Sequence, residues 1–408
     1  MIGREPVSNE NRADHDQPVM RVCLAHGTVG GHSGSGRYIV DVATRFAEDH
    51  HAVTVICHET DASLENYPGI EIVTLPRPSG RFGTWRLGHL LQFRVIKRSL
   101  LRLLKNRHFD VLIGSDLLFL KPIKDFYGSQ LRFIYTPLSM IAPLEIETTK
   151  LGGLREWLGV RLYAGLQRWA LTTADRVVRF TESAVKALER YYRLDLAAKK
   201  LVAVYVSREF EQAPADQAHP ISFDRPEPRE LLWVGRLIEI KNIDFLLRAV
   251  ALVRSTNWIL NVCSDGPDRP RLEALATSMG VTDRVRFLGS LNDLGAVYSR
   301  ASLFLTASLN EQYSLTLMEA YAFGVPILGL RPDWDTVLNS NEDQIIDGVT
   351  GYLIADERDM AMRIDELLVD EPKRQQMARE AYEMKKRGFS FELFFQALSG
   401  AATGAISK

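Results

Sequence analysis

Two series of short apolar runs divide this chain, and most of the runs are followed by a turn and a segment with apolar residues at helical spacing. The runs of the first series are 21–27, 52–57, 110–115 and 132–137, and those of the second are 230–235, 258–263, 284–289, 302–307 and 325–330. Such alternation is typical of a parallel sheet covered by helices on both faces. We therefore expect an α/β fold with two doubly wound, Rossmann-like domains facing each other across a cleft, where open parallel sheets bind ligands.

A change in composition marks the domain boundary. From 208 to 229 the chain is rich in Pro, Ala and charge and poor in periodic apolar residues, which indicates a linker. Residues 1–19 are polar and aperiodic, which indicates a flexible leader. The predicted domains are 20–207 and 230–388, and the amphipathic segment 389–408 is expected to pack back on the first domain.

Charge and cysteine usage exclude several classes of protein. The 408 residues include 50 Lys and Arg and 51 Asp and Glu, so the formal net charge of -1 argues against a nucleic-acid partner. Cys23, Cys57 and Cys263 are widely spaced in apolar stretches, which indicates buried thiols in a reducing compartment. No apolar run could span a bilayer, and no signal pattern is present, so we expect a cytoplasmic protein.

The segment 310–326 contains two glutamates, Glu311 and Glu319, that are eight positions apart. On one helix their side chains would point about 80° apart, so they would not share a face. We expect the helix to begin near Ser314, with Glu311 in the preceding loop and Glu319 on the buried face. A buried carboxylate is costly unless it is paired, so Glu319 is expected to meet either a ligand or a structural arginine.

Two further features at predicted strand ends suit an anion. Arg236 and Lys241 follow the apolar run 230–235, and together they could bind a diphosphate and stabilise charge on a departing phosphate. The amides of residues 313–315 would form the N-terminus of the helix described above, which is a second anion site. A solvated surface role is the alternative for either cation, but their convergence with this helix at one sheet edge favours a binding site.

A glycine-rich turn at 30–36 separates the first predicted strand from the first helix. Its glycines would allow a ligand to approach the backbone. Ile39 stands where a dinucleotide fingerprint has a third glycine or alanine, and the spacing is not that of a Walker loop. His26 precedes this turn and His32 lies within it; a structural role is the commoner one for such a histidine, and a catalytic role is the alternative.

In these motifs the second half resembles the family-four retaining glycosyltransferases of the GT-B fold. The similar segments occur in the order VGRLIEIKN (234–242), SDGPDRPRLEALATSMGVTDRVRFLG (264–289), SLNEQYSLTLMEAYAFGVPILG (308–329) and DGVTGYLI (347–354). The most specific part of this pattern is the pair Glu311 and Glu319, which follows Arg236 and Lys241 along the chain. The first half is similar through its glycine turn and the GRY that follows it.

The resemblance implies transfer of a sugar from a nucleotide sugar, with UDP favoured over GDP, to an acceptor hydroxyl, without a metal or other cofactor. It implies that Arg236 and Lys241 hold the donor diphosphate. Glu319 would bond the ribose hydroxyls, and Glu311 would face the transferred sugar. As catalytic residues it thus implies Arg236, Lys241 and Glu311. Further donor contacts are implied at Gly30, Gly31, Gly235, Gly266, Tyr313, Ser314 and Leu315.

Three positions depart from the family pattern. Leu138 stands where many members have a histidine, so either Asp116 or His26 supplies a polar group there, or none is needed, or activity is altered. Ser264 and Ser314 stand where glycines are usual. The acceptor-side candidates are His26, His32, Ser35, Asp116 and Thr136. Asp333-Trp334-Asp335 imitates a metal-binding Asp-x-Asp, but we interpret it as a loop and expect no metal site.

No acidic residue occurs between Arg77 and Arg107. Cations alternate with apolar residues there, which predicts one or two basic amphipathic helices; the cations are Arg81, Arg86, Arg94, Lys97, Arg98, Arg102, Lys105 and Arg107. A solvated surface helix is the simpler interpretation. Contact with an anionic membrane, or with a phosphorylated acceptor, is the alternative.

The function expected from all these features is retaining sugar transfer to a hydroxyl-bearing acceptor. Three alternatives stay open. The same architecture could carry a nucleotide-sugar epimerase or hydrolase, or a binder without catalytic activity. An NAD-dependent oxidoreductase that used Glu59 as its ribose-binding acid is disfavoured by the incomplete glycine spacing.

Overall fold

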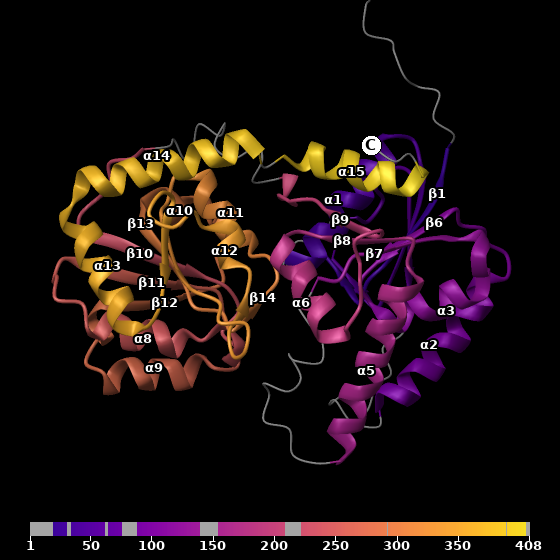
Figure 1. Cartoon of the computed structure of the whole chain (residues 1–408), viewed down its shortest axis with the longest axis horizontal. Helices are drawn as coiled ribbons and strands as arrows, with labels where there is room; N and C mark the ends of the chain where they lie inside the picture. The colour runs from indigo at the N-terminus through magenta and orange to yellow at the C-terminus, as the bar shows by residue number, and fades with distance from the viewer. Residues whose placement is uncertain are drawn as a thin grey trace, which may run out of the picture.

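The computed structural model describes residues 19–30, 34–61, 64–75, 88–138, 154–208, 222–291, 293–388 and 390–404, and only the backbone of 88–93, 154–159 and 385–388. These residues form two α/β halves that lie side by side, and the last two helices run along one side of both (Figure 1). The predicted leader lies outside the described residues up to residue 18, as does the predicted linker from 209 to 221.

The described part of the first half contains a parallel sheet of seven strands, in which β1 lies third from one edge. In spatial order the strands are β5 (Ile70–Thr74), β3 (Ala52–Cys57), β1 (Arg21–Ala25), β6 (Val111–Gly114), β7 (Arg132–Tyr135), β8 (Arg176–Arg179) and β9 (Lys200–Val202). Val22 and Leu24 of β1 enter one core cluster, and Cys23 and Ala25 enter another. The strand is therefore buried on both faces, which explains its uninterrupted apolar sequence.

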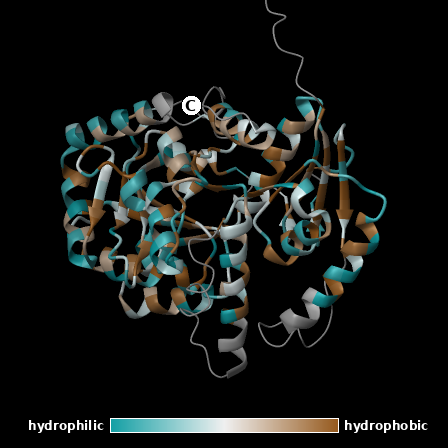
Figure 2. Cartoon of the chain, turned by 45° about the vertical axis from the view of Figure 1, so that its right-hand side comes forward, coloured by the Kyte–Doolittle hydropathy of each residue, from teal (hydrophilic) through white to brown (hydrophobic). Residues whose placement is uncertain are grey.

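Helices cover both faces of this sheet. The helix α1 (Gly34–Glu48) packs on one face, and α3 (Leu117–Tyr127) and α5 (Leu154–Thr173) pack on the other, where α3 also contacts α2 (Gly88–Leu104). The helix α6 (Glu182–Tyr192) follows β8, and a short 3-10 turn, η1 (Gly128–Gln130), follows α3. Figure 2 shows the expected pattern, with hydrophobic strands inside and hydrophilic residues on the outer helix surfaces.

The described part of the second half repeats this plan with six parallel strands around β10. Their spatial order is β12 (Val285–Gly289), β11 (Trp258–Cys263), β10 (Arg229–Val234), β13 (Ala301–Thr306), β15 (Ile327–Leu330) and β17 (Gly351–Ile354). The helices are α8 (Ile243–Ala251), α9 (Arg269–Ser278), α10 (Gly295–Arg300), α11 (Leu315–Ala322), α12 (Asn341–Gln344) and α13 (Glu357–Val369), with the 3-10 turns η2 (Glu239–Lys241) and η3 (Thr282–Arg284). The fold class predicted from the sequence is confirmed.

Two-stranded pairs and the C-terminal helices complete the architecture. The strand β2 (Thr28–Val29) pairs with β4 (Glu59–Thr60), and β14 (Asn310–Glu311) pairs with β16 (Leu338–Asn339). The helix α14 (Glu371–Gly388) packs on α11, and α15 (Phe391–Thr403) lies against the first half (Figure 1). There the ring of Phe394 is 5.9 Å from that of Tyr38, and Arg45 pairs with Glu392 at 3.2 Å.

In each sheet the direction in which the chain adds new strands reverses beside one inner strand. That strand is β1 in the first sheet and β10 in the second. In the first sheet the chain adds β3 and β5 on one side of β1 and then adds β6 on the other; in the second it adds β11 and β12 beside β10 and then β13 opposite. At such a switch point the loops after the two neighbouring strands diverge and leave room for a ligand at their carboxyl ends. The fold thus offers two such positions, between β1 and β6 and between β10 and β13.

Segments that follow strand ends bring the two halves into contact. The ring of Phe180, which follows β8, is 5.3 Å from the ring of Tyr313, which follows β14. The first residue of α1, Gly34, also meets the first residue of α11, because a Cβ on Gly34 would lie 3.0 Å from Cδ1 of Leu315. The carboxyl ends of the two sheets therefore face each other.

The end of the predicted linker is packed on the second half. The Arg225 side chain is nearly fully buried, and its guanidinium donates to the carbonyl oxygens of Ser299 and, at 2.7 Å, Phe323. These carbonyls lie at the ends of α10 and α11, where helix carbonyls lack a partner within the helix. Arg225 therefore connects the segment 222–228 to both helices. No helix in the described part of the chain is long and apolar enough to cross a membrane.

Candidate active site

The switch point of the second sheet brings together residues that are 70 positions apart. Lys241 ends the turn η2 after β10, and Glu311 ends the short strand β14 after β13. The Lys241 ammonium forms an ion pair with Oε2 of Glu311. Arg236 is exposed at the same strand end, and its side chain makes no ion pair with any described residue. The site thus holds one paired cation and one that is free to meet an anion.

Close backbone packing fixes the loop that carries these cations. The amide of Leu237 donates to the carbonyl of Asp265 at 3.0 Å, and its carbonyl accepts from the amide of Asp268 at 3.1 Å. Gly266 lies between them, where a Cβ would be 2.2 Å from the carbonyl oxygen of Leu237. Only glycine fits such an approach, so Gly266 acts here through packing of the loop. Gly235 directly precedes Arg236 at the end of β10.

The backbone geometry of Ser264 favours glycine, which is the usual residue at this position in the family that the chain resembles. Its φ is 98°, a value that is strained for a residue with a Cβ. We therefore expect Ser264→Gly to raise the free energy of unfolding by about 1 kcal/mol in chemical denaturation. Ser264→Ala is the matched control because it keeps the Cβ. An equal gain in the alanine variant would contradict this explanation.

The helix α11 begins at Leu315, one residue after the predicted position, with Ser314 as its N-cap. The prediction that the Ser314 amide is free for an anion is wrong. It donates to Oε1 of Gln344 at 2.9 Å, and Nε2 of Gln344 donates to the Ser314 carbonyl at 3.0 Å. Gln344, at the end of α12, therefore holds the backbone between the two glutamates from both sides.

The helix α12 also contacts the first half. The hydroxyl of Thr181 donates to that of Ser340 at 3.0 Å, and Ser183 donates to Oε1 of Glu342 at 2.9 Å. One short element thus connects α6 of the first half with the backbone at Ser314. The same element therefore contacts both the first half and the segment that precedes α11.

Gln344 is expected to be important for stability. Replacing Gln344 by Leu would leave a buried amide and a buried carbonyl of Ser314 without partners, at about 1–3 kcal/mol for each buried group. We therefore expect a loss of about 2–6 kcal/mol in urea unfolding. Gln396→Leu, at an exposed position of α15, is the control and should change little. Equal effects of the two substitutions would contradict the role of Gln344.

Glu319 lies on the buried face of α11, as predicted, with 9% of its surface exposed. Its Oε2 accepts a hydrogen bond of 2.7 Å from the Tyr298 hydroxyl. Burial raises the pKa of Glu319 to about 7, and the Tyr298 hydrogen bond and the charge of Arg37 partly oppose that rise. The sequence left the partner of Glu319 open, and in the structure its hydrogen-bond partner is Tyr298. Arg37, in α1 of the first half, adds an electrostatic interaction. One carboxylate oxygen, Oε1, is left for a ligand hydroxyl.

The first-sheet switch point holds two of the predicted acceptor-side residues. Nδ1 of His26, after β1, is 2.7 Å from Oγ of Ser115, after β6. Burial lowers the pKa of His26, and the nearby Asp116 carboxylate partly offsets this. Oδ1 of Asp116 accepts from the Leu118 amide at 2.9 Å, so this carboxylate caps α3. The structure brings His26, Ser115 and Asp116 together.

The glycine turn has a different neighbour from the one expected. A Cβ on Gly30 would lie 2.1 Å from Oδ2 of Asp61, so a carboxylate fills the space that the glycine leaves open. An anionic diphosphate would be repelled there, and the prediction that Gly30 approaches the diphosphate is not supported by this geometry. Gly31 and His32 lie outside the described residues. Ser35 is in the first turn of α1, beside the contact with α11.

Thr136 and Leu138 follow β7. Thr136 is buried beside the Tyr38 hydroxyl, away from solvent. Leu138 is half-buried against the core cluster that both halves share, so an apolar side chain takes the place of the usual histidine. The guanidinium of Arg179 holds the Pro137 carbonyl at 3.2 Å and fixes this loop.

The Asp333-Trp334-Asp335 triplet forms a loop. Oδ1 of Asp333 accepts from the amides of Asp335, Thr336 and Val337 at 2.7–2.8 Å. The carboxylate is thus used by its own turn. In the described part of the chain, no group of three or more His, Cys, Asp or Glu side chains is arranged to hold a metal ion.

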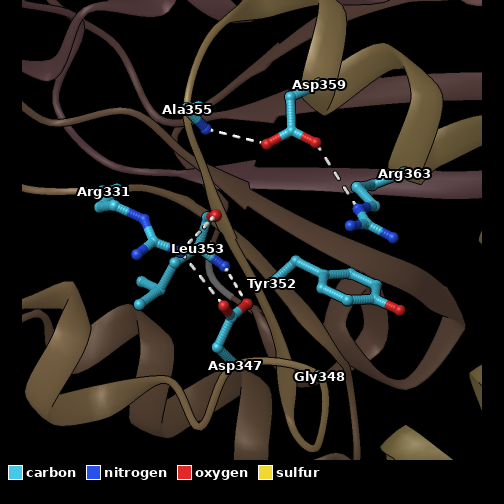
Figure 3. Close-up of a pocket in the computed structure, with 8 residues that line it drawn as sticks. All are labelled: Arg331, Asp347, Gly348, Tyr352, Leu353, Ala355, Asp359 and Arg363. Carbon is cyan, nitrogen blue, oxygen red and sulfur yellow. Dashed lines mark hydrogen bonds and ion pairs between the residues drawn. The ribbon is translucent and has the colours of Figure 1, made fainter.

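A pocket of about 300 Å³ lies beside the edge strand β17 (Figure 3). Its charges satisfy each other, because Arg331 pairs with Asp347 at 3.2 Å and Arg363 with Asp359 at 3.6 Å. The two carboxylates also accept from the edge-strand amides of Leu353 and Ala355. These pairs close the free edge of the sheet, so we do not assign the reaction to this pocket.

Sequence reasoning missed four residues of the site: Arg37, Ser115, Tyr298 and Gln344. Ser115 could have been found, because it ends a predicted strand directly before Asp116. Tyr298 and Gln344 are 21 and 30 positions from the residues that they bond, and neither belongs to a motif. Only the folded structure shows these contacts.

Comparison with known proteins identifies the family. The model described as "Glycosyltransferase Family 4" matches residues 32–205, and the model described as "Glycosyl transferases group 1" matches residues 215–384. A D-inositol 3-phosphate glycosyltransferase of Salinispora tropica is 28% identical over 398 residues, which cover 89% of this chain and 79% of the relative. The lipopolysaccharide core biosynthesis glycosyltransferase LpsE of Rhizobium meliloti is 29% identical over 41% of this chain and 47% of its own.

Solved structures show the same fold. WaaG, a glycosyltransferase of lipopolysaccharide biosynthesis, superposes with a TM-score of 0.71 at 18% identity, over 94% of this chain and all of its own. HepE of Anabaena, in complex with UDP and glucose, superposes with a TM-score of 0.69 at 16% identity, over 94% of this chain and all of its own. Two family models and one shared fold lead to a single conclusion: this chain belongs to the group 1 glycosyltransferases of the GT-B fold.

Proposed function

We propose that this glycosyltransferase uses a UDP-sugar and transfers the sugar to an acceptor hydroxyl with retention of configuration. The observation that carries the proposal is the arrangement at the second-sheet switch point. There Arg236 and the Lys241–Glu311 ion pair lie after β10 and β13, and the buried Glu319 follows on α11. A nucleotide sugar has a diphosphate for the cations and ribose hydroxyls for a carboxylate, so its groups match this arrangement.

Each group of the donor has a partner in this proposal. Arg236 and Lys241 bind the diphosphate and stabilise the charge that develops on it as it leaves. Oε1 of Glu319 accepts from the ribose, while Tyr298 holds Oε2. Glu311 faces the sugar, and its ion pair with Lys241 holds its carboxylate in place. Donor contacts near the backbone of Gly235, Tyr313 and Leu315 complete the proposal.

The proposed reaction is the one that the resemblance to retaining glycosyltransferases suggests. An oxygen of the acceptor forms a bond to the sugar carbon on the face that the nucleotide leaves, and the bond from that carbon to the phosphate oxygen breaks. The acceptor proton passes to the departing phosphate oxygen, so no separate base and no metal is required. Closure of the two halves excludes water, which would otherwise hydrolyse the donor.

Names of similar proteins support a UDP donor. HepE was solved with UDP-glucose as well as with UDP, and a relative in Streptococcus gordonii, 26% identical over 55% of this chain and 44% of its own, is named as a UDP-N-acetylglucosamine-using transferase. A GDP-sugar is the alternative donor, and it is distinguished from a UDP-sugar by comparing the binding of UDP and GDP.

The test is thermal stabilisation by UDP, GDP, ADP and dTDP. A ligand that binds only the native state raises the melting temperature, and at equal ligand concentration a tighter ligand raises it more. We expect the largest shift with UDP and its loss in Lys241→Ala. Arg331→Ala removes a paired cation near the edge strand β17 and should keep the shift. A wild-type protein that none of the four nucleotides stabilises would contradict the proposal.

We further propose that this is a cytoplasmic protein whose basic helix α2 rests on an anionic membrane. Four of its cations, and Lys105 directly after it, are exposed and make no ion pair with any described residue; the four are Arg94, Lys97, Arg98 and Arg102. Val95 is exposed among them, with 43% of its surface accessible. Cations around an apolar side chain suit an anionic lipid surface.

Vesicle binding tests the membrane contact. We expect sedimentation with phosphatidylglycerol vesicles but not with phosphatidylcholine vesicles, and a loss of binding in Lys97→Glu/Arg98→Glu. Arg254→Glu/Arg286→Glu makes the same charge change on the second half and should leave binding intact. Equal binding to both kinds of vesicle, or to neither, would contradict the contact.

A further inference from the structure

His26 and Ser115 lie on either side of the first-sheet switch point. His26 follows β1 and Ser115 follows β6, and between these neighbouring parallel strands the order in which the chain adds strands reverses. Nδ1 of His26 and Oγ of Ser115 are 2.7 Å apart. The two side chains therefore meet where the topology leaves room for a ligand.

The His26 ring is held on one side and open on the other. The backbone amide of His26 donates to the carbonyl of Ile56 at 3.1 Å, and Nδ1 is engaged by Ser115. Nε2 makes no hydrogen bond with any described residue. Burial lowers the pKa of His26, and the Asp116 carboxylate opposes this only in part, so the imidazole is neutral at neutral pH. In either tautomer Nε2 can bond a hydroxyl, because a hydroxyl both donates and accepts.

The helix α1, the first helix after His26, begins beside the proposed donor site. Its first residue, Gly34, meets Leu315 at the start of α11, four positions after Glu311. Leu138, which follows β7, is apolar and packs against the core. Asp116 adds negative charge beside His26, which disfavours a phosphate or carboxylate group of a ligand there.

We propose that Nε2 of His26 hydrogen-bonds the acceptor hydroxyl that attacks the sugar, and that Ser115 is the positioning residue that orients the ring. This inference rests on the proposed function. The acceptor group that His26 meets is an uncharged hydroxyl. His26 takes no proton in the reaction, because the acceptor proton still passes to the departing phosphate oxygen. Its contribution is to orient the acceptor oxygen toward the sugar carbon.

The experiment measures UDP release from UDP-glucose, with water alone and with added glycerol as a minimal hydroxyl acceptor. His26→Asn keeps an amide near the position of Nδ1 and removes Nε2, while His26→Gln keeps a polar group near the position of Nε2. We expect turnover to fall about tenfold in His26→Asn, the size of one neutral hydrogen bond, and to recover in part in His26→Gln. Ser115→Ala should raise the KM for glycerol, and the exposed His108→Asn should change nothing.

UDP binding to each variant separates the two proposals. We expect thermal stabilisation by UDP to be unchanged in the His26 and Ser115 variants, because neither residue contacts the donor. Wild-type turnover together with unchanged rates in His26→Asn and Ser115→Ala would overturn the role of His26 alone. A wild-type protein that neither binds UDP nor releases it from UDP-glucose would overturn the proposed function, and the role of His26 with it.

Discussion

Replacing Lys241 by Ala is expected to reduce turnover of the nucleotide sugar by roughly 100- to 1000-fold, the cost of removing a group that stabilises charge in a transition state. The loss has two parts. The departing diphosphate loses a cation, and Glu311, now without its ion pair, places a half-buried negative charge next to it. Steady-state kinetics with the donor that stabilises the protein best would measure the effect.

Two matched variants make this prediction specific. Lys241→Arg keeps the charge and should retain part of the activity, although a guanidinium cannot reproduce the point-charge geometry of an ammonium. Arg331→Ala removes a cation that also pairs with a carboxylate but lies near β17. Turnover by Lys241→Ala that equals turnover by Arg331→Ala would rule out the assignment of Lys241.

The second large effect is the pH dependence of nucleotide binding through Glu319. Its pKa is about 7 because the carboxyl is buried, and ribose hydroxyls donate to the ionised form. UDP affinity should therefore be constant well above pH 7 and fall about tenfold for each unit below it. In Glu319→Gln we expect weaker binding, by about 1.5–3 kcal/mol, because the hydrogen bonds no longer go to a charged group.

Calorimetric titration of UDP at several pH values would measure this dependence. The nucleotide phosphate also titrates, with a pKa of about 6, but it does so equally for the wild type and Glu319→Gln. The difference between the two proteins thus isolates Glu319. Identical pH profiles for the two would show that Glu319 does not meet the nucleotide.

The same pKa shift has the opposite effect on the stability of the unliganded protein. The folded-state pKa of Glu319 is raised from 4.5 to about 7, so the native state binds this proton more tightly than the unfolded state. The stabilisation is present below the unfolded value and is lost as pH rises through about 7. Above pH 7 the group costs about 3 kcal/mol of stability, since one pKa unit corresponds to about 1.4 kcal/mol.

Much of the architecture could be predicted because it is written in local patterns. The nine apolar runs correspond to strands, since a strand covered on both faces needs side chains such as Val22 and Cys23 in succession. The start of α11 was predicted within one residue. Gly324 and Pro326 are the signals that end this helix. The meeting of Lys241 and Glu311 follows from the same logic, since both come after neighbouring strands.

The parts that could not be predicted depend on tertiary contacts. The Ser314 amide is occupied because α12 places Gln344 beside it, and no local pattern reports the position of that helix. Asp61 fills the space at Gly30 because β2 pairs with β4, and a two-residue strand leaves no periodic signal. The space beside Gly30, which looks open in the sequence, is therefore occupied by Asp61 in the fold.

The most direct test of the account is a crystal structure of the protein with UDP. The account predicts a diphosphate between Arg236 and Lys241 and a ribose whose hydroxyls meet Oε1 of Glu319. Density for the nucleotide beside the glycine turn at Gly30, or in the pocket at Arg331 and Arg363, would contradict it.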